Sequence, residues 1–407
     1  MIHICFNYHD GYYILPQVMV ASLLDTKNPD TQYTLHVMYN TLRNELKNKL
    51  EEIVDNRAIV NYIDMSSEFS LYKEDCWNVT AMYRLAIAEH LKNVDKIIYI
   101  DGDCLVFDDL TNMYNIDMND NLFMGQADYK KTFKICCNLM KTDFKKYICS
   151  GVMLMNLKLL REYNFKDKVN DYLNRNNGDT HCSADQGVLN YLCKDKIDYL
   201  PARYGFLWHE YCYEDVLISC YLHDVTTPLY YSEKEYIDGF KNVAILHLIM
   251  NPFGKKAFHY PYGITDRFGR KFFEIAYKYN IINKVPNTFI LKTINNLFVN
   301  VDEENNSLKL GFKNNITFTL EDEYLYIKQV NKYVSINDNN EVVLTEEKRN
   351  KWIIYPNVNR KTYQIYARNK WNFVLDIDHS MLAPGTKLQI YEMNDTVAQD
   401  FIISNCV

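Results

Sequence analysis

The 407-residue sequence contains no hydrophobic stretch that approaches the roughly 18 residues needed for a membrane-spanning helix. Its first residues, MIHICFNYHDGYY, lack the basic flank and the long apolar run of a secretory signal peptide. The formal net charge of -7 carries no positive excess, which disfavours general binding to nucleic acid. From these absences we expect a cytoplasmic protein, either free or peripheral at the inner face of the membrane.

The cysteines lack the spacings that a zinc site or a redox pair needs. There is no CxxC pair, the total of 11 is odd, and the adjacent Cys136 and Cys137 do not form such a motif. Others, such as Cys5, Cys104 and Cys220, stand in apolar segments. We therefore expect reduced and mostly buried thiols.

The first half of the sequence alternates β-branched runs with amphipathic segments. Strands are predicted at residues 2–6, 33–38, 58–63 and 96–100, and helices at 17–24, from a cap at Thr41, and at 80–91. Strands separated by helices of this length indicate an α/β fold with a mostly parallel sheet covered on both faces. Such sheets bind ligands beyond the carboxyl ends of their strands, so the residues that follow each strand are the first candidates.

The residue pattern changes near residue 286, and beyond that point only short strands and Asn/Asp/Lys turns are predicted. Residues 333–337 parallel 374–378, and residues 351–354 parallel 400–403, with a weaker first copy at 298–320. Three copies of about 40 residues are typical of a β-trefoil. We therefore divide the chain into residues 1–285 and an all-β trefoil domain at residues 286–407.

Asp101-Gly102-Asp103 directly follows the buried strand at residues 96–100. Two carboxylates separated by one residue can reach a single hard cation, and the glycine lets a diphosphate approach the backbone. A divalent cation there would offset the charge that builds on a departing nucleoside diphosphate. Acidic pairs at strand ends are also common turn formers, as Asp108-Asp109 illustrates, so the motif alone does not decide between the two interpretations.

Several motifs in order carry a resemblance to a known family. They are Asp101-Gly102-Asp103, then Cys149-Ser150-Gly151 with the apolar run after it, then Asp185-Gln186, then His247. This array resembles glycosyltransferase family 8, which contains retaining galactosyl- and glucosyltransferases, and the similarity runs from residue 2 to about 280. The resemblance implies a Rossmann-like nucleotide-diphospho-sugar transferase fold of the GT-A type.

The resemblance also implies a metal site. In the family, the two aspartates of the DxD motif and a late histidine hold manganese against the UDP phosphates. These roles fall on Asp101, Asp103 and His247, with Mn²⁺ or Mg²⁺ as the ion. His247 follows the apolar run 243–246, as a ligand at a strand end should, although a lone histidine there is more often a core residue.

The nucleotide is expected to contact the first strand and its turn, where Asn7, Tyr8 and Tyr12 stand. Tyr12 is placed to stack on the uracil ring. The family's acidic contact to the base is replaced here by His9. Arg84, in a segment that matches a family Y/A-R-L motif, is expected to reach the donor; its alternative is a surface charge on a helix.

The β-phosphate is expected to meet a glycine and a lysine that follow the late histidine. The candidates are Gly254 and either Lys255 or Lys256. The spacing from His247 is about two residues longer than the family's, and the family's K-P-W ending is absent.

Two residues are expected at the reacting centre. The family assigns a donor-sugar contact to Asp185 and places Gln186 near the reacting carbon, and Ser183 is predicted to cap their helix. An acidic residue in a first helical turn is also favoured by the helix dipole, which is the structural alternative for Asp185. Cys149 replaces the asparagine that contacts the donor sugar in the family, which leaves glucose and galactose both open.

The repeats at the C-terminus resemble the ricin-type lectin repeat with its Q-x-W/F signature. A carboxylate and an aromatic ring that converge on a shallow pocket suit a pyranose, and Asp376 and Tyr391 of the third repeat can supply them. Gln399 belongs to the signature and alternatively only stitches the trefoil core. The alternative for the whole domain is a packing or oligomerisation role.

A basic segment rich in aromatic residues spans positions 252–284 and suits either an anionic membrane surface or a helix packed on the main domain. Taken together, the sequence predicts a retaining hexosyltransferase that moves glucose or galactose from a UDP-sugar to a glycan or glycoconjugate with a divalent metal. The alternative is a weak or inactive enzyme that binds sugar through its trefoil.

Overall fold

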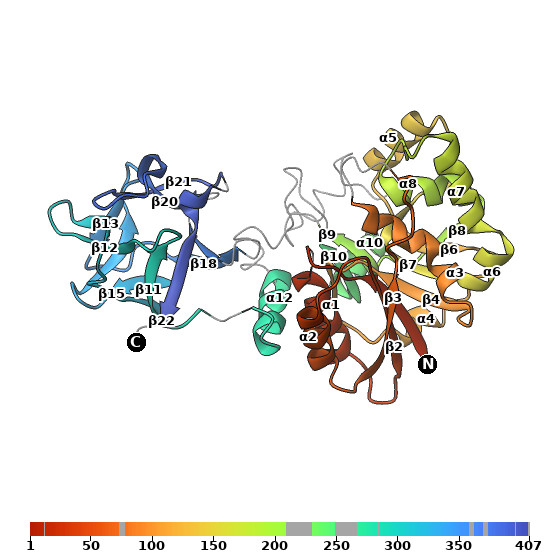
Figure 1. Ribbon diagram of the computed structural model, residues 1–407, viewed down its shortest axis with the longest axis horizontal. Coiled ribbons are helices and arrows are strands. Elements are labelled where there is room, and N and C mark those ends of the chain that lie inside the picture. Colours follow the sequence, from red (N-terminus) through yellow and green to blue (C-terminus); the bar gives the residue numbers. More distant parts are fainter. Residues whose placement is uncertain are drawn as a thin grey trace. The chain divides into compact units, whose positions relative to one another are not determined.

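The computed structural model describes residues 1–11, 13–72, 78–208, 230–248, 267–282, 285–357, 362–368, 373–394 and 396–405. The chain divides into two compact units, residues 1–257 and 258–407 (Figure 1). Among the described residues, no helix is both long enough and apolar enough to cross a bilayer.

The described part of the first unit contains a seven-stranded sheet in the order β3-β2-β1-β4-β7-β6-β8. Its strands are β1 (Ile2–Asn7), β2 (Tyr33–Tyr39), β3 (Ala58–Asp64), β4 (Lys96–Ile100), β6 (Phe123–Ala127), β7 (Ile148–Asn156) and β8 (Ile197–Tyr199). β1 is parallel to β2 and β4, whereas β7 is antiparallel to both β4 and β6. The start of β7 therefore lies beside the carboxyl end of β4.

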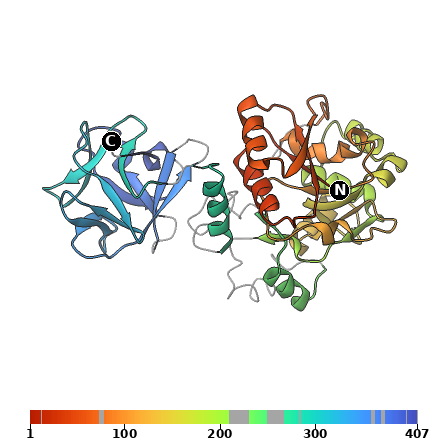
Figure 2. The same ribbon diagram turned by 90° about the horizontal axis from the view of Figure 1, so that it is seen from below.

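Helices lie on both faces of this sheet (Figure 1, Figure 2). The helices in the described part of the first unit are α1 (Ile14–Asp25), α2 (Asn44–Val54), η1 (Val79–Ala86), α3 (Ile87–His90), α4 (Thr111–Tyr114), α5 (Lys130–Met140), α6 (Leu157–Glu162), α7 (Phe165–Arg175), α8 (Ala184–Cys193) and α10 (Glu233–Lys241). A small sheet of β5 (Cys104–Val106), β10 (Ile245–Leu248) and β9 (Tyr204–Trp208) adjoins them. The α/β fold expected from the alternating pattern is confirmed.

One predicted helix start is wrong, and one predicted helix is present but begins with another helix type. The helix expected from a Thr41 cap begins at Asn44, because the Asp10 carboxylate accepts the backbone N–H of Arg43 and fixes the entry there. The helix expected at residues 80–91 starts as the 3₁₀-helix η1, and the Asn78 side chain accepts from the backbone N–H of Thr80. Hydrophobic spacing does not separate these two helix types, since both place apolar residues three positions apart on one face.

Cys136 and Cys182 form a disulfide that joins α5 to the loop before α8, with their Cα atoms 5.8 Å apart. The expectation of reduced thiols is wrong for this pair. The two cysteines are 46 positions apart in the sequence, a spacing that carries no signal of a disulfide. The expected burial is confirmed at Cys5, Cys104 and Cys193. Burial raises the pKa of the Cys5 and Cys193 thiols well above the ordinary value.

The second unit contains an all-β module whose repeats match the predicted copies. Its strands are β11 (Thr288–Thr293), β12 (Phe298–Asp302), β13 (Ser307–Gly311), β14 (Phe318–Glu321), β15 (Tyr324–Ile327), β16 (Lys332–Ile336), β17 (Val342–Thr345), β18 (Trp352–Asn357), β19 (Thr362–Ala367), β20 (Phe373–Ile377), β21 (Leu388–Glu392) and β22 (Phe401–Asn405). Three of its antiparallel hairpins, β12–β13, β16–β17 and β20–β21, recur at equivalent places in the repeats.

The second strands of these hairpins, β13, β17 and β21, contact one another, so the three repeats close one end of the module together. β22 pairs with both β11 and β19, which brings the last strand of the module beside its first. The two 3₁₀ turns η3 (Asp378–Ser380) and η4 (Val397–Gln399) complete the third repeat. This nearly closed sheet with threefold repetition is the expected β-trefoil.

The composition change predicts a boundary at residues 285–286, whereas the compact units divide at 257–258. The difference is α12 (Arg267–Lys278), which groups with the second unit. Phe272 and Phe273 of this helix are buried, and burial raises the pKa of Tyr277 to about 12. Residues 252–266 and 283–284 of the basic, aromatic segment lie outside the described residues, so its membrane contact stays a prediction.

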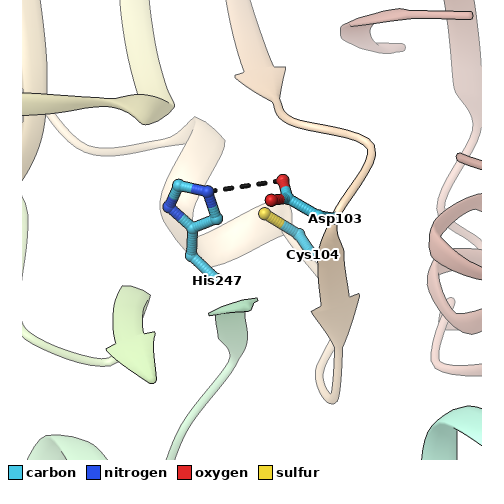
Figure 3. A group of neighbouring side chains, drawn as sticks. All are labelled: Asp103, Cys104 and His247. Atoms are coloured by element: carbon cyan, nitrogen blue, oxygen red, sulfur yellow. Dashed lines mark ion pairs between the residues drawn. The ribbon is translucent and has the colours of Figure 1, made fainter. Parts of the chain in front are cut away.

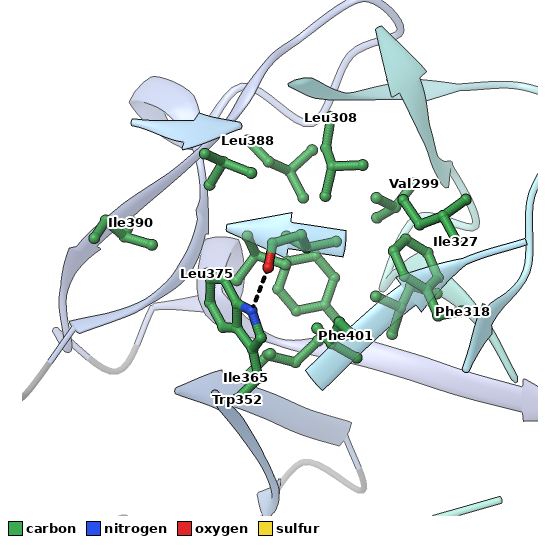
Figure 4. Close-up of a cluster of buried hydrophobic side chains, with 14 of the residues drawn as sticks. Val299, Leu308, Phe318, Ile327, Trp352, Ile365, Leu375, Leu388, Ile390 and Phe401 are labelled. Atoms are coloured by element: carbon green, nitrogen blue, oxygen red, sulfur yellow. Dashed lines mark hydrogen bonds between the residues drawn. The ribbon is translucent and has the colours of Figure 1, made fainter. Parts of the chain in front are cut away.

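The core of the trefoil is formed by apolar side chains from all three repeats (Figure 4). Trp352 is 1% exposed, and its indole N–H donates to the Val334 carbonyl oxygen at 2.8 Å. The donor is therefore satisfied inside the core, as burial of a tryptophan requires. This bond links β18 of the second repeat to β16 of the same repeat.

We expect Trp352→Ala to lower the free energy of unfolding of the second unit by about 3–5 kcal/mol, because it leaves a large cavity and an unpaired carbonyl. Urea unfolding followed by circular dichroism measures the loss. Tyr391→Ala is the matched control, since Tyr391 is 52% exposed. A control loss as large as that of Trp352→Ala would contradict this account of the core.

Candidate functional site

The turn after β4 is held from two sides. The backbone N–H of Asp101 donates to the Gly151 carbonyl on β7 at 2.7 Å, and the N–H of Leu248 donates to the Asp103 carbonyl at 2.9 Å. β5 pairs antiparallel with β10, and this register sets Cys104 opposite His247. The acidic turn and the histidine thus meet at the carboxyl end of β4, where the sequence predicted them.

Glycines are required at two points of this arrangement. A Cβ atom at position 151 would stand 2.2 Å from the His247 ring, so only glycine leaves room for that imidazole beside β7. A Cβ atom at position 102 would stand 2.4 Å from the Pro16 ring of α1. The packing of the turn on α1 therefore accounts for Gly102 without any ligand.

Asp103, Cys104 and His247 present ligand atoms that all lie within 4.8 Å of one another (Figure 3). His247 Nε2 lies 3.4 Å from Asp103 Oδ1 and 3.9 Å from Asp101 Oδ2. Two carboxylates and an imidazole fit a divalent cation such as Mn²⁺, while the Cys104 thiol is a softer donor that such ions do not prefer. The three predicted ligands are thus brought together, and Cys104 was not foreseen.

His247 is 7% exposed, and burial alone would lower the pKa of its imidazole. The Asp103 carboxylate outweighs burial and, with the Cys149 thiol 3.8 Å from Nδ1, raises the pKa of His247 to about 10. In the metal-free protein the imidazole therefore carries a proton at neutral pH. Because a histidine binds metal only as the neutral ring, metal binding must displace this proton.

Arg84 joins the turn to α8. Its Nη2 lies 2.9 Å from Asp101 Oδ1, and its Nε lies 3.1 Å from Asp185 Oδ2. Nη1 also donates to the Ser150 carbonyl at 2.6 Å, and the guanidinium stands 4.5 Å above the Tyr99 ring. Burial raises the pKa of Asp185 to about 6 even though Arg84 opposes the rise. Arg84 is therefore a buried positioning group and not a surface charge.

Gln186 is fixed through both ends of its amide. Its Oε1 accepts the Ser150 backbone N–H at 3.1 Å, and its Nε2 donates to Asp128 Oδ2 at 2.7 Å. Asp128 follows β6 and is 5% exposed, and burial raises the pKa of its carboxyl. Sequence reasoning missed Asp128 because it stands alone in Gln126-Ala127-Asp128-Tyr129, without a second acidic residue to mark it.

α8 enters the site by an irregular loop. Ser183 and Ala184 both have φ near +50°, in the left-handed region. Ser183 occupies the N-cap position, but its side chain makes no capping hydrogen bond, so the predicted cap is wrong in its chemistry. The loop, which the Cys136–Cys182 disulfide anchors, sets where Asp185 and Gln186 begin the helix.

These side chains surround one cavity of about 260 Å³. Its walls are formed by Ala81, Arg84, Asp101, Asp103, Asp128, Tyr129, Thr132, Cys149, Ser150, Gly151, Ser183, Asp185, Gln186, Leu207 and His247. The predicted metal ligands, the predicted reacting-centre residues and Arg84 thus share one space. The cavity is rich in carboxylates, with one buried guanidinium between two of them.

Asn7 and Tyr8, which were predicted to contact the nucleotide, do not line this cavity. Asn7 Nδ2 donates to Tyr99 Oη at 3.1 Å, while Asn7 Oδ1 is buried with no hydrogen-bond partner among the described residues. Tyr8 has no exposed surface, and its hydroxyl donates to the Leu46 carbonyl in the core. Tyr12 lies outside the described residues.

The phosphate-binding candidates Gly254, Lys255 and Lys256 also lie outside the described residues, so their role stays a prediction. The described part of the strand before them, β10, ends at Leu248.

In the trefoil, Asp376 is 4% exposed and accepts from Gln389 Nε2 at 3.1 Å. Gln399 has no exposed surface; its Nε2 donates to the Glu392 carbonyl, and its Oε1 accepts the Asn394 N–H. These contacts agree with the alternative interpretation of Gln399, in which it holds the third repeat together. Tyr391 is 52% exposed on the same face of the β20–β21 hairpin as Asp376.

The fold of the first unit and the acidic turn at the end of β4 define a sugar transferase of the GT-A type. Residues 3–252 match the sequence model of Glycosyl transferase family 8, so the chain belongs to that family.

Two curated proteins are similar to the chain. General stress protein A of Bacillus subtilis is 24% identical over 258 residues, which cover 60% of this chain and 86% of that protein. A putative glycosyltransferase of Haemophilus influenzae is 24% identical over 212 residues, which cover 49% of this chain and 62% of that protein, less than two thirds of its length.

Among solved structures, the galactosyltransferase LgtC in complex with donor and acceptor sugar analogues superposes with a TM-score of 0.56 at 22% identity. The match covers 70% of this chain and 98% of that one. At this identity the likeness establishes the fold and leaves the substrates open.

We expect NMR of the metal-free protein to find His247 protonated up to about pH 10, because Asp103 raises its pKa. Because the pKa is higher in the folded protein, protonation of His247 contributes fully to the free energy of unfolding below pH 6.5. This contribution is lost as the pH rises toward about 10. In Asp103→Asn the main group that opposes burial is lost, so the pKa of His247 should fall. His36, whose pKa burial lowers to about 4, should stay neutral throughout and is the internal control.

Proposed function

We propose that the chain is a retaining hexosyltransferase that moves glucose or galactose from a UDP-sugar to a glycan or glycoconjugate acceptor with a divalent metal. The observation that carries the proposal is the single cavity in which Asp103 and His247 face the same space as Asp185 and Gln186. A shared cavity supports a cation and a donor sugar that bind next to each other.

The residues present fit a divalent cation. Asp103 and His247 would hold it, with Asp101 as the third ligand. Bound there, Mn²⁺ or Mg²⁺ would supply positive charge that offsets the charge on a leaving diphosphate.

Arg84 prepares the cavity before any ligand enters. It holds Asp101 toward the cation site and Asp185 toward the donor-sugar side, so neither carboxylate must reorganise when a substrate binds. Asp185 lies at the first turn of α8 and is the group placed to accept hydroxyls of the donor sugar. Cys149, which stands beside His247, offers no comparable hydrogen-bonding group to that sugar.

Gln186 and Asp128 form the wall that faces the reacting carbon. Positive charge develops on a sugar ring as its bond to the leaving group breaks, and the amide oxygen of Gln186 is suited to stabilise it. The Asp128 carboxylate, 2.7 Å from Gln186 Nε2, fixes this amide and adds negative charge behind it.

Retention is best served by attack on the same face from which the diphosphate leaves. The acceptor hydroxyl would then give its proton to the leaving phosphate, and the chain's own residues orient the partners and exclude water. Asp185 is tied to Arg84 and Gln186 is neutral, so neither is proposed as a nucleophile. A sugar trapped covalently on either residue would contradict this mechanism.

A sugar-binding role through the trefoil alone has weaker support. The Asp376 carboxylate already accepts a hydrogen bond from Gln389 Nε2. The Gln399 amide donates and accepts hydrogen bonds inside the third repeat. The trefoil is therefore proposed as an accessory part of an active transferase.

We expect the chain to hydrolyse UDP-glucose or UDP-galactose slowly when Mn²⁺ is present and to lose this activity at least a hundredfold in Asp103→Ala. The variant removes a metal ligand and leaves His247 without its partner. Released UDP is the quantity to measure, with and without candidate glycans. Asp120→Ala is the matched control, because Asp120 is an exposed aspartate on a turn. Full activity in Asp103→Ala would refute the metal-dependent mechanism.

We expect Asp128→Ala to lower kcat by about tenfold to a hundredfold and to leave the donor KM nearly unchanged, because a loosened Gln186 affects the transition state more than binding. Steady-state kinetics of transfer measure the split. Asp128→Asn should recover part of the loss, since its amide oxygen can still accept from Gln186 Nε2. A rise in KM alone would assign Asp128 to donor binding instead.

A further inference from the structure

A second cavity, of about 970 Å³, lies in the first unit away from the catalytic cavity. Its walls come from the ends of three helices: Met140 and Lys141 from α5, Tyr172 from α7, and Tyr191 and Lys194 from α8. These helices are neighbours in Figure 1. No residue of this cavity takes part in the site described above.

The second cavity offers the Tyr191 ring to a ligand. The Tyr163 ring is covered by Lys168, whose Nζ lies 4.8 Å from its centroid, and Tyr172 is 9% exposed and packs against both Tyr191 and His181. Tyr191 is 38% exposed, and its ring is tilted by 58° to that of Tyr172, with the ring centroids 5.5 Å apart. An exposed ring of this kind suits the C–H face of a pyranose.

The rim is positively charged. Lys141, Lys168, Arg175 and Lys194 surround the opening, and Asp171 is the single carboxylate in the lining. The Arg175–Asp171 pair is long, at 3.9 Å, and both side chains are largely exposed. Such a gathering of cations in a chain of net charge -7 favours an anionic ligand.

Two helices connect this cavity to the catalytic one. Thr132 and Gln186, near the starts of α5 and α8, line the catalytic cavity, whereas Lys141 and Lys194, at their ends, line the second. Along α8, the rise of 1.5 Å per residue from Gln186 to Lys194 amounts to about 12 Å. The disulfide at Cys136 fastens α5 to the loop that begins α8, so the two cavities share one rigid wall.

We propose that the second cavity binds an acidic sugar residue, bearing a carboxylate or a phosphate, of the glycan that the enzyme extends. The inference rests on the proposed function, because it treats the ligand as part of the acceptor. Leu139, at the rim, is 55% exposed, which also suits an anionic lipid surface. The concave shape and the exposed Tyr191 ring favour a sugar over a bilayer.

Calorimetry on the full chain tests the proposal with three probes: a short oligogalacturonide, its neutral methyl ester, and an oligosaccharide that carries a terminal phosphate. We expect binding of at least one acidic probe and at least tenfold weaker binding of the methyl ester. Affinity for the acidic probe should fall severalfold as salt rises from about 50 to 300 mM, because its charge contacts are screened. The preferred acidic probe identifies carboxylate or phosphate as the recognised group.

Two variants locate the binding. The double variant Lys141→Glu, Lys194→Glu should weaken the acidic probe at least tenfold, and Tyr191→Ala should weaken it severalfold. Lys92→Glu changes an exposed lysine remote from this lining and should leave the affinity unchanged. Unfolding midpoints close to that of the unmodified chain show that each variant is folded.

Equal affinity in the unmodified chain and the double variant would overturn the proposal, as would equal binding of the neutral ester. The proposal would also be overturned if the chain binds no oligosaccharide but sediments with anionic phospholipid vesicles, and if Leu139→Asp abolishes this sedimentation. That result would assign the cavity to a membrane surface. Donor hydrolysis is measured on the same variants. Hydrolysis without probe binding refutes this inference alone, whereas absent hydrolysis in the unmodified chain refutes the proposed function.

Discussion

The site depends on one buried cation shared between two carboxylates. Arg84 holds Asp101 from the turn after β4 and Asp185 from the start of α8, two segments that are more than 80 positions apart in the sequence. A buried guanidinium is stable only while its partners remain, and loss of either carboxylate leaves an uncompensated charge. The shape of the catalytic cavity and the packing of α8 against the sheet therefore both depend on the Arg84 ion pairs.

The parts of the site that the sequence predicted are those marked by local patterns. Asp101 and Asp103 follow a buried strand with the two-residue spacing of a cation site. His247 is assigned through the family resemblance, and its strand β10 pairs with β5 directly after the turn. Asp128 bears no such mark, because its importance comes from Gln186, which meets it only after β6, β7 and α8 have packed. Spacing reveals neighbours along one element and is silent about neighbours across elements.

The fold shows the same division. The repeats of the trefoil and the strand pattern of the first unit are periodic, and the structure has them where the periods place them. The start of α2 is decided by Asp10, and the disulfide partner of Cys136 by the approach of the loop before α8. Both are contacts between distant segments, which compete with local propensity and here prevail over it.

The pairing of β22 with β11 has a consequence for biosynthesis. The described strands of the first unit all precede residue 249, so they can form while the ribosome is still translating the rest. The trefoil is completed later: β11 pairs early with β12 and β14, but its longest pairing is with β22, the last of the described strands. Before β22 is synthesised, the edge of β11 that it will cover is unpaired and can associate with other chains. The trefoil is therefore exposed to aggregation for longer than the first unit.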